Sequence, residues 1–215
     1  MKIAIIGATG FVGSNLVKEF AARNHEITAI SRNPQSSGEG TVKTVAADIF
    51  DTDSLSAILK NHDIVINAYN PGWTNPNIYD DFIKGSKSIQ AAVKQAGVKR
   101  FITIGGGGSL FVAPGVQAVD TEGFPVEYKA GATAARDYLN MIQNEKELDW
   151  AFFSPAFEMH AGITTGRTGK YRLGLDNPVF DNDNRSVLSV EDLAVVIADE
   201  AENPKHHQQR FTAGY

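Results

Sequence analysis

Three glycines near the start of the chain, Gly7, Gly10 and Gly13, have the type and spacing of a nucleotide-binding turn. They follow the apolar run 2–7, which is typical of a buried strand, and they open an amphipathic helix expected to end at about Arg23. Gly7 would permit a tight bend, Gly10 the close approach of a pyrophosphate, and Gly13 the packing of the helix on the sheet. The amides and positive dipole at the helix start favour phosphate. A purely structural glycine turn is the alternative.

The end of the second predicted strand, residues 26–31, bears on which dinucleotide would bind. Ser31 and Arg32 stand there, and no carboxylate follows before Glu39. An acidic residue would accept hydrogen bonds from the ribose hydroxyls of NAD, whereas an arginine offers a bidentate partner for the 2′-phosphate of NADP. NADP(H) is therefore favoured over NAD(H), with a solvated loop arginine as the alternative.

Apolar runs alternate with amphipathic stretches along the chain, which is typical of repeated β-helix-β units. Such units stack into an α/β fold, here a Rossmann-like doubly wound parallel sheet of order 3-2-1-4-5-6 with a short C-terminal strand. Ligands of these sheets bind beyond the carboxyl ends of the strands. Residues 1–215 are predicted to form a single NAD(P)-binding Rossmann domain, with substrate-side elements from about 69–79, 105–128 and 154–188.

Composition excludes several other classes of protein. A length of 215 residues, 42% of them hydrophobic, suits one core, and a net charge of −5 argues against nucleic acid or an anionic membrane as partner. The absence of cysteine excludes disulfides and thiol chemistry. His206 and His207 have no carboxylate at a chelating spacing, so we predict no metal and read both as surface residues. Strand-sized apolar runs and no signal-like leader lead us to expect a cytoplasmic protein.

Several segments carry a resemblance to a known superfamily. GATGFVG, the SR pair, AADIFD and VKRFITIGG together resemble the atypical, extended-type short-chain dehydrogenase/reductase superfamily in its NmrA-like, NAD(P)H-binding branch. GRTGKYRLG, SVEDLAVVIADE and RFTAGY are similar to segments of bacterial proteins provisionally classed as NADH-flavin reductases. With the arguments above, this resemblance implies a cofactor-binding set of Gly7, Thr9, Gly10, Phe11, Val12, Gly13, Ser31, Arg32, Asp48, Ile49, Ala68, Tyr69, Gly105, Gly106, Pro155, Ala156 and Phe157. Within that set, Asp48 has helix capping as an equal alternative.

The acid-base residues of the superfamily are incomplete in this chain. Its dehydrogenases carry a tyrosine and, one helical turn later, a lysine, whereas here Tyr128 is followed at that distance by Ala132. Lys129 projects about 100° away around a helix and cannot simply substitute. The serine expected at the end of the fifth strand is also absent, and Ser109 comes only later. Ser109, Tyr128 and His160 remain the candidate proton donors, each with a packing or solvated role as the alternative.

The remaining residues suit a reaction that needs little acid-base help. Hydride transfer from a reduced nicotinamide to a flavin ring requires mainly alignment and exclusion of water. Gly105 to Gly108 would form a flat slot, with Gly107 and Gly108 on the substrate, unless they are simply a flexible loop. Trp73 is the best stacking candidate, although it could equally cover the core or meet another subunit. In a predicted hairpin over 166–174, Arg167, or alternatively Arg172, would meet a carboxylate or phosphate of the substrate.

Two classes of function fit these features. The first is an NAD(P)H-dependent oxidoreductase that reduces a flavin or a similar planar conjugated small molecule. The alternative is a non-catalytic, NADP(H)-binding, redox-sensing regulator of the NmrA-like kind. A sugar-nucleotide epimerase is a more distant third, because such enzymes normally carry the Tyr-Lys pair. The sequence leaves a homodimer open.

Overall fold

The computed structural model describes residues 1–34 and 40–215, and eight of its strands form one sheet. The sheet order is β3-β2-β1-β4-β5-β8-β10-β9, which confirms the predicted Rossmann-like order, with β8 as the predicted sixth strand. All neighbours are parallel except β9 and β10. Glu39, used in the cofactor argument, lies outside the described residues. The strands are β1 (Lys2–Ile6), β2 (Glu26–Ser31), β3 (Val42–Ala46), β4 (Ile64–Asn67), β5 (Arg100–Ile104), β8 (Asp149–Phe153), β9 (Arg172–Gly174) and β10 (Gln209–Gly214).

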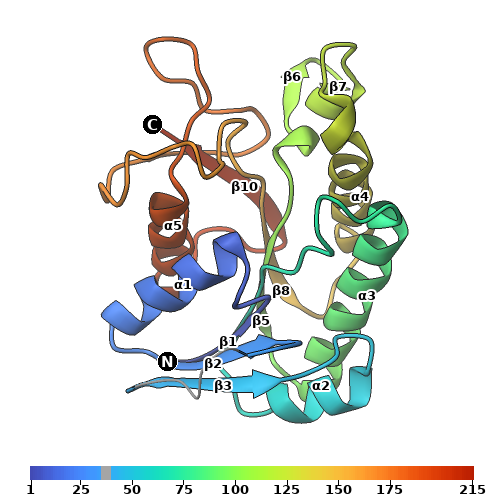
Figure 1. Ribbon diagram of the computed structural model, residues 1–215, viewed down its shortest axis with the longest axis vertical. Helices are drawn as coiled ribbons and strands as arrows, with labels where there is room; N and C mark the ends of the chain where they lie inside the picture. Colours follow the sequence, from blue (N-terminus) through green and yellow to red (C-terminus); the bar gives the residue numbers. More distant parts are fainter. Residues whose placement is uncertain (35–39) are drawn as a thin grey trace.

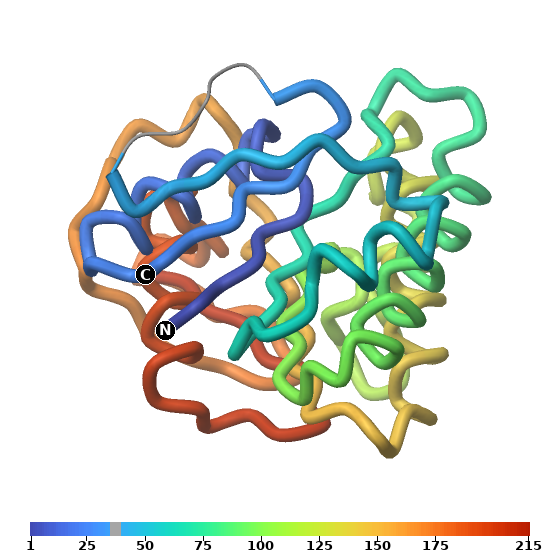
Figure 2. The backbone as a smooth tube through the Cα atoms, turned by 90° about the horizontal axis from the view of Figure 1, so that it is seen from below, coloured from blue at the N-terminus to red at the C-terminus, as the bar shows by residue number. Residues whose placement is uncertain are grey.

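Helices cover both faces of this sheet. Figures 1 and 2 show α1 (Phe11–Ala22) and α5 (Val190–Glu202) together on one side. On the other side lie α2 (Thr52–Leu59), α3 (Ile78–Ala96) and α4 (Val126–Ile142). Between β5 and α4 the chain forms two short 3-10 turns, η1 (Gly107–Ser109) and η2 (Ala118–Asp120), and a small hairpin of β6 (Phe111–Ala113) and β7 (Val116–Gln117).

Strand β1 is apolar at successive positions, without the alternation of apolar and polar residues seen in half-exposed strands. Ile3 and Ile5 belong to the core that includes α1 and α5, whereas Ala4 and Ile6 belong to the core that includes α2, α3 and α4. Successive side chains of a strand point to opposite faces, so a strand covered on both faces needs an apolar residue at every position. Both faces are therefore filled by the protein's own side chains, and a ligand has access at the ends of the strands.

The hairpin expected over residues 166–174 is wrong. Residues Arg172–Gly174 instead form β9, an edge strand antiparallel to β10, and Gly166 and Gly169 make left-handed turns at φ 72° and 69°. The buried carboxylate of Asp192 in α5 accepts hydrogen bonds from the amides of Thr168 (2.9 Å) and Gly169 (2.8 Å). This long-range anchor, which local sequence does not reveal, holds the segment against α5.

The interpretation of His206 as a surface residue is also wrong. His206 is buried, its ring stacks on Phe211 at 4.3 Å, and its Nδ1 lies 2.8 Å from Oε2 of Glu200. Glu200 accepts a further hydrogen bond of 2.6 Å from Arg100. His207 is exposed, as predicted. Burial opposes ionisation of Glu200, but hydrogen bonds from the ring and amide of His206 outweigh it and hold the pKa of this carboxyl below its usual value.

Two features were not found among the described residues. No helix in residues 1–34 and 40–215 is both long and apolar enough to cross a membrane. The same part of the chain contains no cluster of three or more His, Asp or Glu side chains arranged to hold a metal ion.

Replacing Glu200 with Gln should lower the free energy of unfolding by about 3 kcal/mol at neutral pH, because Arg100 loses a buried counter-charge. Since the pKa of Glu200 is lowered in the folded state, its carboxylate contributes fully above the unfolded-state pKa. That contribution is lost as the pH falls through the folded-state pKa. The difference between wild type and E200Q should therefore shrink below about pH 4 in urea unfolding.

The exposed carboxylate of Glu147 provides the matched control. Its side chain is 73% exposed and pairs with Lys94 at 2.7 Å, and an exposed ion pair contributes only about 0–1 kcal/mol. Equal losses of stability in E200Q and E147Q would contradict the role given to the buried network.

Candidate nucleotide-binding site

A cavity of about 430 Å³ lies at the carboxyl ends of the central strands. It is bounded by the turn after β1, the end of β2, the loops after β3 and β4, and the segments that follow β5 and β8. This is the place where the strand order reverses and where open α/β sheets bind their ligands. Of the predicted site residues, those that line it are Gly7, Thr9, Gly10, Phe11, Val12, Ser31, Arg32, Ile49, Ala68, Tyr69, Trp73, Gly105 and Pro155.

The three glycines of the first turn meet different constraints. Gly7 has φ +79°, and a Cβ there would lie 2.5 Å from the carbonyl oxygen of Ala68. A Cβ at Gly13 would lie 2.1 Å from the carbonyl oxygen of Gly7, so the helix can pack on the turn only without a side chain. Gly10 is different, because its Cβ would meet only the Gly7 oxygen, at 3.3 Å. Folding thus requires Gly7 and Gly13, whereas the space beside Gly10 is open to a ligand.

The first turn of α1 faces this cavity, and the amide of Gly10 is already used, because it donates to the carbonyl oxygen of Gly7 at 3.0 Å. Gly10 is the N-cap and makes no side-chain capping bond, and Gly10, Phe11 and Val12 all line the cavity. The first amides of a helix have no partner within the helix, and together with the helix dipole they favour an anion. No acidic residue stands in this first turn. The geometry therefore fits a phosphate or pyrophosphate group.

Tyr69 and Arg32 mark the end of the cavity near β2 and β4. Burial first, and then the charge of Asp81, raises the pKa of Tyr69 to about 12, while the charge of Arg32 opposes this shift. The Tyr69 hydroxyl donates to the carbonyl oxygen of Asp81 at 3.2 Å. A Cβ at Gly85 would lie 2.4 Å from the Tyr69 ring, so this glycine of α3 makes room for it. Nothing in the local pattern around Gly85 indicated that role.

Asp48 and its neighbours show which acid caps α2. The N-cap is Asp51, whose carboxylate accepts from the amide of Ser54 at 3.1 Å. Asp48 instead accepts from the amide of Phe50 at 2.9 Å and stays exposed. The alternative that Asp48 caps the helix is therefore wrong. Ile49 lines the cavity and Asp48 does not, so the adenine contact of Asp48 stays a prediction.

The expectation that residues 105–108 form an open slot must be corrected. Only Gly105 lines the cavity, and a Cβ there would lie 2.0 Å from the Phe152 ring. A Cβ at Gly106 would lie 3.2 Å from that of Ala135, and one at Gly107 would lie 2.7 Å from the carbonyl oxygen of Pro155. Gly108 is buried, and a Cβ there would lie 3.0 Å from the Cβ of Ala132. These glycines allow close packing within the protein, and Gly107 and Gly108 offer no substrate surface.

Ser109 is not placed to donate a proton to a ligand. It is fully buried, and its hydroxyl lies 2.8 Å from the carbonyl oxygen of Gly106 and 2.9 Å from Oγ of Ser154. It does not line the cavity. Its role as a catalytic candidate is corrected to that of a residue that fixes the turn after β5.

Trp73 forms one wall of the cavity and is held by α4. The indole is 54% exposed, and its ring centroid lies 5.3 Å from that of Tyr128 in an edge-on arrangement at 85°. A Cβ at Gly131 would lie 2.8 Å from the indole, so Gly131 provides the place in which it packs. Trp73 thus joins the loop after β4 to α4. Tyr128 contacts Trp73 but does not itself line the cavity.

The remaining candidates lie outside the cavity lining. His160 is exposed, and its Nδ1 accepts a hydrogen bond from the amide of Gly162 at 3.1 Å. Arg167 makes two hydrogen bonds of 2.7 and 2.9 Å to Glu19 of α1, so the substrate contact expected of it is wrong. Ala156 is buried, and Phe157 is exposed and does not line the cavity. Their nicotinamide contacts stay predictions.

The chemistry available in the cavity follows from its lining. Among the described lining residues, the ionisable side chains are Arg32 and Tyr69, both at the nucleotide end. Near β5 and β8 the lining consists of Ile104, Gly105, Pro155 and Met159, none of which exchanges a proton. Met159 was missed from sequence, although its position four residues beyond Pro155 on the loop after β8 was a usable signal. The arrangement can bind and align a ligand there but offers no side-chain acid or base.

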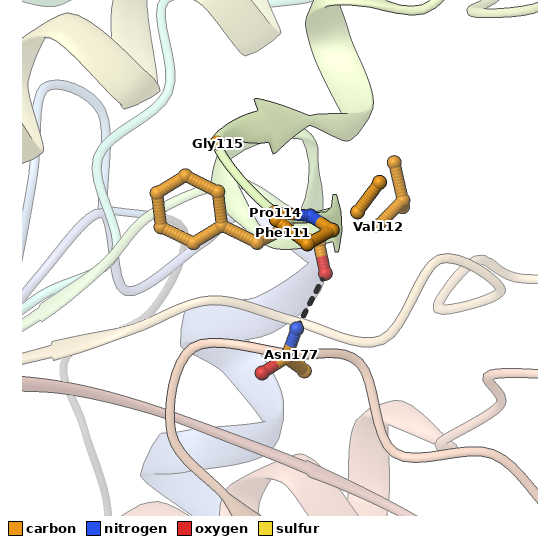
Figure 3. Close-up of a pocket in the computed structure, with 6 residues that line it drawn as sticks. Phe111, Val112, Pro114, Gly115 and Asn177 are labelled. Carbon is orange, nitrogen blue, oxygen red and sulfur yellow. Dashed lines mark hydrogen bonds between the residues drawn. The ribbon is translucent and has the colours of Figure 1, made fainter.

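A second hollow of about 550 Å³ lies beside the β6–β7 hairpin (Figure 3). Phe111, Val112, Pro114 and Gly115 of the hairpin line it together with Asn177, whose amide donates to the carbonyl oxygen of Phe111 at 2.8 Å. No acid, base or nucleophile stands in this lining among the described residues, so we assign it no chemistry.

Fold and cavity together define a dinucleotide-binding protein with an oxidoreductase-like fold. The profile of a family described as NAD(P)H-binding matches residues 7–204, and the chain therefore belongs to the NAD(P)H-binding family. The resemblance to the extended short-chain dehydrogenase/reductase superfamily in its NmrA-like branch is confirmed at this level.

Several similar proteins span the whole chain. The uncharacterised protein YwnB of Bacillus subtilis is 35% identical over 99% of this chain and 97% of its own length. A solved structure from Bacteroides thetaiotaomicron, provisionally named an epimerase, is 46% identical with a TM-score of 0.91 and covers 100% of this chain and 96% of its own. A structure from Streptococcus pneumoniae, provisionally named an NADH-flavin reductase, is 30% identical with a TM-score of 0.85 and covers 100% and 99%.

Replacing Gly10 with Ala should weaken the binding of NADPH by at least about tenfold, or about 1.4 kcal/mol, while the protein stays folded. The added methyl group would meet only the carbonyl oxygen of Gly7, at 3.3 Å, which requires a small shift of the turn, and it would occupy the approach to the helix amides. A titration of NADPH fluorescence, with thermal unfolding measured alongside, tests both statements. As control, Gly13→Ala should lose stability instead, and unchanged affinity in folded G10A would overturn the role of Gly10.

Proposed function

We propose that this protein is an NADPH-dependent oxidoreductase that reduces a planar conjugated acceptor such as a flavin. The observation that carries the proposal is the contrast between the two ends of the cavity: hydrogen-bond donors and Arg32 at one end, and an apolar, partly aromatic lining without acid or base at the other. Reduction of a conjugated ring tolerates such a lining, because it needs alignment more than proton transfer from a side chain.

The residues at the nucleotide end fit NADPH. The amides at the start of α1 would hold the pyrophosphate, and Ser31 and Arg32 would hold the 2′-phosphate. Gly105 and Pro155 would lie beside the nicotinamide, because they end β5 and follow β8 on the far side of the switch point. The pKa of Tyr69, about 12, keeps its phenol neutral, so it serves as a hydrogen-bond donor and not as an acid.

When bound, NADPH would supply a hydride, and with one proton from water this would reduce the acceptor by two electrons and leave NADP⁺. The chain contributes positioning: Trp73 offers its indole face to a flat ring, and Gly105 permits close approach to the end of β5. The half-exposed mouth at Trp73 gives water access to the acceptor.

The epimerase provisionally named among the similar structures is a weaker assignment for this chain. Epimerisation at a carbinol carbon with a nicotinamide proceeds through transient oxidation, in which a side chain must take the proton of the hydroxyl group and later return it. The described lining holds Tyr69 alone as a phenol, and because burial raises its pKa to about 12, almost no phenolate is present at neutral pH to accept a proton.

The function is tested by anaerobic stopped-flow absorbance with NADPH, riboflavin, FMN and a naphthoquinone, against a reaction without enzyme. Oxidation of NADPH coupled to bleaching of an acceptor, faster than the control, is the expected result. Tight NADPH binding with no transfer to any acceptor would overturn the proposal and favour the redox-sensing regulator, whose site needs no acid or base either.

Replacing Arg32 with Glu should weaken NADPH binding by about 1.5–3 kcal/mol and NADH binding much less, because only the 2′-phosphate loses a charged hydrogen bond. Isothermal titration with both dinucleotides measures the difference. Lys18→Glu, which makes the same charge change on the exposed side of α1, serves as control. Equal weakening of both dinucleotides by R32E would refute the preference for NADP(H).

A further inference from the structure

We infer that the acceptor is an uncharged planar ring system, such as riboflavin or an unsubstituted quinone, and that phosphorylated flavins are poor substrates. This inference rests on the proposed function and specifies its substrate class. Its basis is the distribution of charge around the acceptor end of the cavity and the way in which Trp73 is fixed there.

The cavity offers an anionic acceptor no cation. Arg32 is the sole charged side chain in its described lining, and it stands at the end of β2. Gly105 stands at the end of β5, three strands away in the sheet order. Neighbouring strands are about 4.8 Å apart, so about 14 Å separates Arg32 from the acceptor end. Arg32 therefore serves the dinucleotide and cannot also bind the phosphate of a flavin.

The rim around Trp73 is acidic. The first turn of α3 carries Asp80 and Asp81, and the first turn of α4 carries Glu127. Both helix starts lie against Trp73, since a Cβ at Gly131 would meet the indole and also Ile78, at 2.9 Å. A ligand phosphate at this rim would lose water and meet like charge, which is unfavourable.

The cations near this rim do not reverse its charge. Arg136 of α4 is held by Asp137 at 2.5 Å and by Asp120 at 3.1 Å. Arg185, near the loop after β8, is held by Glu158. Lys129 is exposed on α4 but lies two residues before Gly131, about 200° around the helix from this position against Trp73, whereas Glu127 lies about one turn before Gly131 on the same side.

Trp73 is a fixed surface suited to a flat, neutral ring. Its indole contacts the Tyr128 ring edge-on and packs on Gly131, both in α4, and these contacts restrict the orientation of its stacking face. An ordered aromatic face binds a conjugated ring with little loss of side-chain entropy. The chain's other tryptophan, Trp150, is 2% exposed, so a ligand that stacks on a surface tryptophan can stack only on Trp73.

Riboflavin and FMN form a matched pair of probes, because they share one ring and differ by one phosphate. With saturating NADPH, kcat/KM for riboflavin should exceed that for FMN by at least tenfold, and added salt should narrow the gap by screening the rim. With NADP⁺ present, so that no turnover occurs, quenching of flavin fluorescence should show tighter binding of riboflavin than of FMN. Trp73→Leu should abolish this quenching for both flavins.

A substitution at Met159 tests whether the lack of a cation at the acceptor end disfavours FMN. It lines the acceptor end, half-buried, so Met159→Lys places a cation there, while Met159→Gln changes polarity and keeps the charge and similar length. M159K should raise kcat/KM for FMN relative to riboflavin by at least tenfold, and M159Q should leave the ratio within twofold of wild type.

The outcomes distinguish failure of the proposed substrate class from failure of the proposed reductase function. Equal or better turnover of FMN by the wild type would overturn the substrate class and leave the reductase function standing. No turnover of either flavin or of a neutral quinone, in a protein that binds NADPH, would overturn the proposed function and this inference with it.

Discussion

The contact between the first turn of α1 and the turn that precedes it is the constraint on which the site depends. Gly13 lies directly against the carbonyl oxygen of Gly7, and Gly7 lies against that of Ala68 at the end of β4. The amides of Gly7 and Ala8 both donate to the carbonyl oxygen of Ile30, at 3.0 and 3.1 Å. One turn of glycine-rich chain thus fixes the ends of β1, β2 and β4 relative to the start of α1.

Everything at the nucleotide end follows from that fixed turn. Because Ile30 is held there, Ser31 and Arg32 emerge beside the start of α1, where its amides point into the cavity. Because Ala68 is held there, Tyr69 enters the cavity wall, and Gly85 of α3 is needed to receive its ring. The position of the donors at this end is therefore a consequence of backbone packing, and in the proposed function Ser31 and Arg32 add the preference for NADPH over NADH.

Sequence predicted the parts of this structure that depend on neighbours along the chain. The order of the sheet and the strand at residues 26–31 followed from hydrophobic runs, and the tight bend at Gly7 followed from the spacing of the glycines. The errors fell where partners are distant. Arg167 binds Glu19, 148 positions away, and Ser109 binds Ser154, 45 positions away. No local pattern carries such pairs, so exposure and reactivity were misjudged at these residues.

Near the end of β5, Ala132 stands where the resemblance to the superfamily implies a lysine. Ala132 is 6% exposed and packs closely against Gly108, so the turn after β5 rests on α4 in the space that a lysine side chain would require. Restoring the lysine would bury an ammonium group or displace that turn, and Gly131 beside it already holds Trp73. Helix α4 has thus become a support for packing, with an aromatic wall in place of an acid-base pair. A cavity built in this way favours reactions in which the cofactor supplies the reactivity and the protein supplies the alignment.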